Sequence, residues 1–200
     1  MHFKMRFVRV LSIVAGLSLF SAAALADGKE GDFNLGRSSS GQLKVEFAAD
    51  LFPFALPLSP EPELSGWAFD DPGFFSIDFD EPAEDFFQLA NGANISFEII
   101  SIDAGFKVWT TFLTLLPPLV APGDQWNIGE VPFDTHPWWN IDPTDPGYDP
   151  LDTEWSVTFR LIDIGTTGYS PSEPITATFT PEPAGLGALA LGLLLAARRR

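Results

Sequence analysis

The segment WSVTFRL, residues 155–161, carries the clearest structural signal in this chain. Its apolar side chains, Trp155, Val157, Phe159 and Leu161, alternate with polar ones at every intervening position. Successive side chains on a β-strand point to opposite faces, so a period of two indicates one buried face and one solvated face. We therefore expect a half-buried β-strand here.

The same alternation recurs in five further segments, at residues 43–47, 75–79, 95–99, 106–114 and 175–179. No window between them shows the three-to-four-residue period of a helix. The 18 prolines and 17 glycines lie mostly between these segments, where they break helices and favour turns. Residues 27–180 are thus predicted to form an all-β body, a single antiparallel β-sandwich of about seven strands. Residues 52–72 and 117–152 are predicted to be long loops.

The core of this body is expected to be aromatic. The chain has 19 phenylalanines and six tryptophans, and it has no cysteine. Each buried ring removes a large apolar area from water, so packed rings can supply stability where no disulfide can form. We expect most of these rings to lie in the core and few of them to form a binding surface.

The N-terminus, residues 1–26, is typical of a secretory signal peptide. Three basic residues precede an apolar stretch at residues 10–19. Ala24 and Ala26 place small side chains at the two positions that signal peptidase inspects, which predicts cleavage before Asp27 and export through the inner membrane. An uncleaved membrane anchor is the alternative.

The C-terminus, residues 181–200, combines a Pro-Glu-Pro motif, an uncharged apolar stretch and a terminal arginine triplet. These parts are Pro181, Glu182 and Pro183, residues 184–197, and Arg198, Arg199 and Arg200. The order resembles the PEP-CTERM sorting tail of exported bacterial proteins, also catalogued as an ice-binding protein C-terminal domain. That resemblance implies processing near the motif by a membrane transpeptidase of the exosortase type.

The length of the apolar stretch agrees with a temporary membrane anchor. Fourteen residues span roughly 21 Å as a helix, against about 30 Å for the hydrocarbon core of a bilayer. The arginines favour a cytoplasmic C-terminus, which leaves the body outside. We expect a short transmembrane helix that is later removed, after which the protein lies in the envelope, at the cell surface or outside the cell. A permanent anchor is the alternative.

The charge of the body restricts its partners. Residues 27–183 hold five basic and 27 acidic residues, a net charge of −22. Such a surface repels nucleic acids and anionic lipids, so a nucleic-acid partner is not expected. It favours divalent cations or basic partners.

The segment from Asp134 to Asp142 is the strongest candidate site, because it joins His136 to two adjacent tryptophans. Carboxylates follow it on a loop rich in proline and glycine, at Asp145, Asp149 and Asp152. Carboxylate oxygens on a turn-rich loop are the ligands that calcium requires, which makes Asp142 and these three residues a candidate calcium site. The same residues would equally serve as solvated turns. The pair Asp70-Asp71 is a weaker candidate of the same kind.

Zinc is the second candidate metal. His136 together with Asp134 or Asp142 offers nitrogen and oxygen ligands, although the set is small for zinc. The run from His136 through Trp138 to the Asp-Pro-Gly turn resembles one exported family with this sorting tail, and some such proteins belong to zinc-starvation regulons.

Glycan binding is a further hypothesis for the same segment. Exposed rings stack on sugars, and Trp138 and Trp139 are adjacent, so on a strand one would face outward and the other would anchor the segment in the core. The sequence has no Gly-x-Ser-x-Gly motif, no metalloprotease histidine pair and no cysteine nucleophile, while carboxylate pairs for glycan cleavage stay open. We therefore expect a non-enzymatic structural or adhesive protein of the envelope or extracellular polysaccharide. Metal binding is the first alternative, and glycan binding or cleavage is the second.

Overall fold

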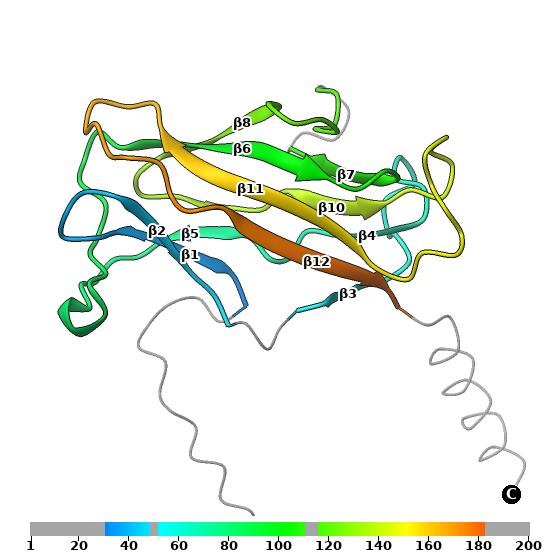
Figure 1. The fold of residues 1–200 in the computed structure, drawn as a ribbon, viewed down its shortest axis with the longest axis horizontal. Helices are drawn as coiled ribbons and strands as arrows, with labels where there is room; N and C mark the ends of the chain where they lie inside the picture. Colours follow the sequence, from blue (N-terminus) through cyan, green and yellow to red (C-terminus); the bar gives the residue numbers. More distant parts are fainter. Residues whose placement is uncertain (1–30, 49–51, 111–115, 183–200) are drawn as a thin grey trace, which may run out of the picture.

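The computed structural model describes residues 31–48, 52–110 and 116–182, and these residues form an all-β structure (Figure 1). This confirms the predicted fold class. The described strands are β1 (Phe33–Arg37), β2 (Leu43–Glu46), β3 (Phe54–Leu56), β4 (Trp67–Phe69), β5 (Phe74–Ser76), β6 (Asn94–Ile102), β7 (Phe106–Trp109), β8 (Gln125–Glu130), β9 (Asp134–Thr135), β10 (Trp138–Ile141), β11 (Trp155–Asp163) and β12 (Ile175–Pro181). One short 3-10 helix, η2, spans Pro82–Glu84.

The described strands form three sheets. Their orders are β2-β1-β5-β9, β4-β10-β7 and β3-β12-β11-β6-β8. Most neighbours are antiparallel, but β1 pairs with β5 and β3 pairs with β12 in parallel. The arrangement therefore differs from the expected two antiparallel sheets of about seven strands.

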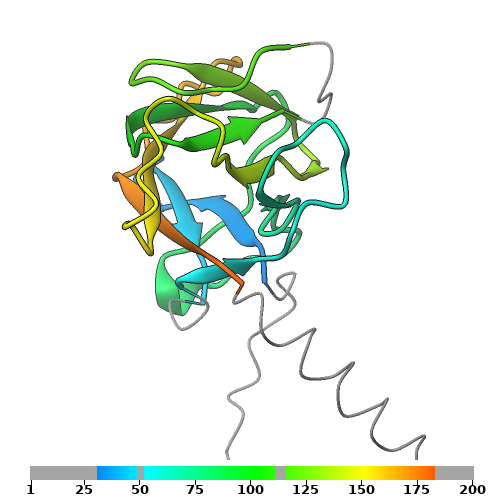
Figure 2. The same cartoon turned by 90° about the vertical axis from the view of Figure 1, so that its right-hand side faces the viewer.

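Aromatic rings from all three sheets meet in one hydrophobic core. Phe159 of β11 packs edge-on against Phe33 of β1 and Phe74 of β5, with ring centroids 5.4 and 5.8 Å away. Phe179 of β12 stacks on Trp139 of β10 at 5.1 Å and on Phe106 of β7 at 4.8 Å. The five-stranded sheet thus faces both shorter sheets, an arrangement visible when Figures 1 and 2 are compared. The expected aromatic core is present.

The alternating segments of the sequence all contain strands. Segment 155–161 lies within β11, and the other five lie in or overlap β2, β5, β6, β7 and β12. The two predicted long loops are wrong in part, because residues 52–72 include β3 and β4 and residues 117–152 include β8, β9 and β10.

The last described residues belong to the folded body. Strand β12 lies between β11 and β3, and its register pairs Pro181 with Leu56. The backbone N–H of Glu182 then donates to the carbonyl oxygen of Leu56 at 2.8 Å. Two residues of the Pro-Glu-Pro motif, Pro181 and Glu182, are therefore held by the sheet, two residues beyond the boundary expected at 180.

The predicted targeting segments lie outside the described residues. This applies to residues 1–26, with Ala24 and Ala26, and to Pro183, the apolar stretch 184–197 and Arg198, Arg199 and Arg200. In the ranges that are described, no helix has the length and apolar character needed to cross a membrane.

Candidate metal centre

Strand pairing gathers the candidate site from three distant parts of the chain. Phe33 at the start of β1 lies opposite Phe74 of β5, and Phe74 lies opposite Thr135 of β9. Because these three residues are neighbours across the sheet, Asp32 before β1 and His136 after β9 meet at the same sheet end.

The loop before β5 is fixed on this sheet end by backbone hydrogen bonds. The N–H of Gly73 donates to the Asp32 carboxylate at 2.7 Å, and the N–H of Phe33 donates to the carbonyl oxygen of Gly73 at 2.9 Å. The His136 ring packs directly on Gly73, where a Cβ atom would lie only 2.6 Å from Nδ1. The glycine thus provides the space that the imidazole occupies.

The hydrogen bonds of His136 define which ring nitrogen can bind a cation. Nδ1 lies 2.8 Å from the carbonyl oxygen of Asp70, which can only accept, so Nδ1 carries a proton and donates it. In the neutral ring Nε2 then keeps its lone pair, and it faces Asp134 Oδ1 at 3.2 Å and Asp32 Oδ2 at 4.0 Å. A lone pair that faces carboxylate oxygens is stable only with a cation between them, either a proton or a metal ion.

The spacing of these atoms agrees with a metal site. Zinc–nitrogen and zinc–oxygen bonds of about 2.0–2.2 Å place tetrahedral ligands roughly 3.3–3.6 Å apart, close to the 3.2 and 4.0 Å observed. Asp71 Oδ1 lies 3.1 Å from Nδ1 on the other side of the ring. One donor atom from each of Asp32, Asp71 and His136 lies within 4.8 Å of the others. The site therefore combines the Nε2 nitrogen with the carboxylates of Asp134 and Asp32, while Asp71 lies at the protonated Nδ1.

The structure brings together only some of the residues predicted for this site. Asp134 contacts His136 as expected. Asp142 does not, because its Oδ2 accepts a hydrogen bond from Lys107 Nζ at 2.7 Å. Lys107 also contacts Asp145 Oδ2 at 3.1 Å. The Lys107 ammonium group thus neutralises two of the four carboxylates expected to bind calcium.

The ion pairs of Lys107 change the ionisation of all three groups. Burial acts to raise the pKa of Asp142, but hydrogen bonds from Lys107 and Thr144 outweigh it and lower that pKa. The N–H of Gly147 and then Lys107 lower the pKa of Asp145. Burial acts to lower the pKa of Lys107, and the two carboxylates outweigh burial and raise it. All three groups are thus charged near neutral pH.

The other two predicted calcium ligands form turns. Asp149 Oδ1 accepts the backbone N–H of Leu151 at 2.9 Å, and the N–H of Asp152 donates to the carbonyl oxygen of Asp149. Within the described ranges the four loop carboxylates do not form a group that could hold a metal ion. The expected calcium site is therefore corrected. In this loop Lys107 pairs with Asp142 and Asp145, and Asp149 accepts the backbone N–H of Leu151, as Asp commonly does in turns.

The adjacent Trp138 and Trp139 lie on opposite faces of β10, as expected for neighbouring residues of a strand. Trp139 is fully buried and stacks in the core, while Trp138 faces the other side of β10 and is partly buried opposite Trp109. Trp139 therefore cannot be a glycan platform, and Trp138 has only part of its ring available.

Two residues of the site carried little or no sequence signal. Asp71 belongs to the acid pair noted as a weaker candidate, and Asp32 was missed. A lone aspartate next to the glycine in Gly31-Asp32 looks like any turn residue, and only the pairing of β1 with β5 makes it a neighbour of His136.

In comparisons with protein-family models, curated proteins and solved structures, no match to this chain was found.

Proposed function

We propose that this chain is an exported protein whose β-body binds a divalent metal ion, zinc in first place, at His136. The observation that carries the proposal is the position of Nε2, whose lone pair faces the carboxylates of Asp134 and Asp32 at 3.2 and 4.0 Å. The bond from Nδ1 to the Asp70 carbonyl fixes the tautomer, as backbone carbonyls do for many metal-binding histidines.

The donor set favours zinc over calcium. Calcium takes oxygen ligands, six to eight of them as a rule, whereas an imidazole nitrogen suits zinc and other borderline metals. One nitrogen and two carboxylate oxygens match the usual zinc ligand types and leave one of four tetrahedral positions for water.

The exposure of the residues at the site favours exchange of the ion with solvent. The side chain of Asp32 is only 4% exposed, but that of His136 is 25% exposed and those of Asp71 and Asp134 are 47% and 49% exposed. Structural zinc sites are closed, whereas this site opens to solvent on one side. It therefore suits reversible metal capture better than permanent stabilisation.

Calorimetric titration of the metal-free protein with zinc, manganese and calcium chlorides tests the proposal. We expect one zinc ion per chain, weaker manganese binding and no specific calcium binding. His136→Ala should abolish zinc binding, and Asp134→Asn should weaken it at least tenfold. Asp149→Asn is the matched control, because it removes the same charge from an exposed turn.

Two results would overturn metal binding. Zinc affinity that is unchanged in His136→Ala would place the ion elsewhere on the acidic surface. Absence of zinc binding in the wild-type chain would mean that the contacts of His136 with Asp32 and Asp134 are hydrogen bonds or ion pairs of the fold alone.

We further propose that the body acts at the cell surface or in the extracellular matrix, in a structural or adhesive role, after its sorting tail is processed. Its three sheets would then serve as one β-sandwich module, a proposal supported by the ring contacts that join them. Intact-mass analysis of protein from the native host tests the export: the chain should begin at Asp27 and lack Arg198, Arg199 and Arg200. Retention of the whole tail would leave a permanent anchor instead.

A further inference from the structure

The carboxylate of Asp71 lies on the side of the His136 ring that faces away from Asp134. Its Oδ1 is 3.1 Å from Nδ1, whereas Asp134 and Asp32 lie closest to Nε2. The two ring nitrogens are chemically distinct, and the hydrogen bond at one of them decides what the other can bind. A carboxylate beside Nδ1 therefore acts on the ligand nitrogen through the ring.

Nδ1 has two oxygen atoms within reach of its proton. It donates to the Asp70 carbonyl at 2.8 Å, and Asp71 adds a negative charge 3.1 Å from the same atom. Both favour the tautomer in which Nε2 keeps its lone pair. The ring becomes more positive when Nε2 binds a cation, and a carboxylate close to Nδ1 stabilises that charge.

The loop that supplies both oxygen atoms is held on the sheet end by hydrogen bonds. Asp32 Oδ1 accepts the N–H of Gly73 at 2.7 Å, and the carbonyl oxygen of Gly73 accepts the N–H of Phe33 at 2.9 Å. Asp32 thus fixes the loop with one oxygen and turns the other, Oδ2, toward Nε2 at 4.0 Å. The acceptors at Nδ1 and the carboxylate at Nε2 therefore belong to one connected unit.

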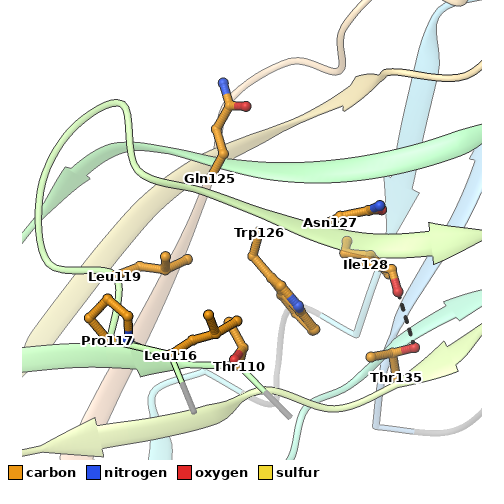
Figure 3. A pocket seen from close by; sticks show the side chains of 9 residues that line it. All are labelled: Thr110, Leu116, Pro117, Leu119, Gln125, Trp126, Asn127, Ile128 and Thr135. Carbon is orange, nitrogen blue, oxygen red and sulfur yellow. Dashed lines mark hydrogen bonds between the residues drawn. The ribbon is translucent and has the colours of Figure 1, made fainter. Parts of the chain in front are cut away.

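His136 is positioned from another direction by the residue before it. Thr135 pairs with Phe74 in the sheet, and its hydroxyl group points to the Ile128 carbonyl of β8 at 3.5 Å (Figure 3). Thr135 also lines the pocket of about 520 Å³ drawn there. None of the nine residues that line this pocket is Asp, Glu or His, so they add no ligand to the metal centre.

We propose that Asp71 is a positioning residue of the metal centre, whose carboxylate keeps the proton on Nδ1 and strengthens the binding of zinc at Nε2. This inference rests on the proposed function. Partners of this kind contribute about 10–100-fold to metal affinity. The Asp71 side chain is 47% exposed, so solvent screens its charge, and we expect the low end of that range, about tenfold.

Calorimetric titration of the full chain with zinc chloride, compared between two neighbouring variants, tests this role. Asp71→Asn keeps the side-chain shape and removes the charge, so zinc should bind about tenfold more weakly while the melting temperature of the metal-free protein stays the same. The loss should shrink in about 1 M sodium chloride. Asp70→Asn is the matched control, because it removes the same charge one residue earlier and keeps the carbonyl that accepts from Nδ1. It should bind zinc nearly as the wild type does.

Nitrogen-15 NMR of histidine-labelled protein identifies the nitrogen that binds the ion. The chain has two histidines, His2 and His136, and the His136→Ala variant assigns their signals. On addition of zinc to the wild type, the Nε2 resonance of His136 should shift strongly, and Nδ1 should keep its proton. Asp71→Asn should show the same pattern at higher zinc concentration.

The outcomes separate this inference from the proposed function. If zinc binds at His136 but Asp71→Asn and Asp70→Asn have equal affinities, the positioning role is overturned and the metal centre remains. A zinc-induced shift at Nδ1, with binding abolished in Asp71→Asn, would also overturn it, because Asp71 would then be a ligand. A lower melting temperature of Asp71→Asn with unchanged zinc affinity would assign Asp71 to the fold alone. Absence of zinc binding in the wild type would overturn both proposals.

Discussion

The indole N–H of Trp139 donates a 2.9 Å hydrogen bond to the carbonyl oxygen of Pro72. Trp139 is fully buried, so the loop that carries Asp70 and Asp71 rests directly on the aromatic core. The position of the candidate metal ligands is therefore coupled to core packing.

Replacement of Trp139 by phenylalanine should affect both stability and the site. The change leaves the Pro72 carbonyl without its donor and removes part of a packed ring, so we expect a loss of about 1–3 kcal/mol in the free energy of unfolding. Urea denaturation measures this loss. Trp138→Phe, on the partly buried face of the same strand, should cost less than half as much, and equal losses would contradict the assigned roles.

A methyl group at Gly73 should collide with the imidazole. A Cβ there would lie 2.6 Å from His136 Nδ1, so Gly73→Ala should cost about 1–3 kcal/mol in the free energy of unfolding. His136→Ala removes the obstacle. In a double-mutant cycle the combined variant should therefore be more stable than the two single losses predict, by about 0.5–3 kcal/mol. Strictly additive losses would show that the ring does not lie against Gly73.

Lys107→Met should destabilise the loop that follows β10. The change leaves the carboxylates of Asp142 and Asp145 close together without their cation, and Asp142 is mostly buried. We expect a loss of about 1–3 kcal/mol, or about 2–4 °C in melting temperature for each kcal/mol. Lys44→Met is the matched control, since it removes the same charge from a partly buried side chain whose ammonium group donates to the backbone carbonyls of Glu84 and Asp85 and lies over the Phe86 ring. Equal melting temperatures for the two variants would contradict this role.

The stabilisation by Lys107 should depend on pH in a defined way. The pKa values of Asp142 and Asp145 are lowered from the ordinary 3.8, so their contribution is present above pH 3.8 and is lost as pH falls through the folded-state values. The pKa of Lys107 is raised from 10.5, so its contribution is present below pH 10.5 and is lost at higher pH. The difference in unfolding free energy between wild type and Lys107→Met should therefore be largest between about pH 5 and 9. Chemical denaturation at a series of pH values measures it, and a constant difference from pH 2 to pH 9 would be the contrary result.

The sequence predicts a strand wherever one face of the strand is buried and the other is exposed to solvent. In β11 the odd residues from Trp155 to Leu161 are buried, so the pattern is visible without a structure. In β10 three of four residues are buried on both sides of the strand, which removes the alternation. Strands β3, β4 and β9 have only two or three residues, too few for any period to show.

The candidate site was predictable only where its residues are close in sequence. Asp134 and His136 are two residues apart, and their contact follows from local geometry. Asp32 reaches the site because β1 and β5 pair in parallel, a long-range contact that alternation does not encode. In the acidic loop the sequence predicted a metal site that the structure does not form. The lysine that neutralises Asp142 and Asp145 is Lys107, which lies 35 residues before Asp142 and so is not visible in the local sequence.

The pairing of Pro181 and Glu182 with Leu56 determines how the body responds to a mechanical pull. A force applied to the chain beyond Glu182 acts along β12, which has β3 on one side and β11 on the other. Hydrogen bonds between strands run across the strand axis. A force along the strand therefore loads all of these bonds at the same time, and it does not break them one after another. A protein tethered at this end would resist extraction of its last strand with both neighbouring strands at once.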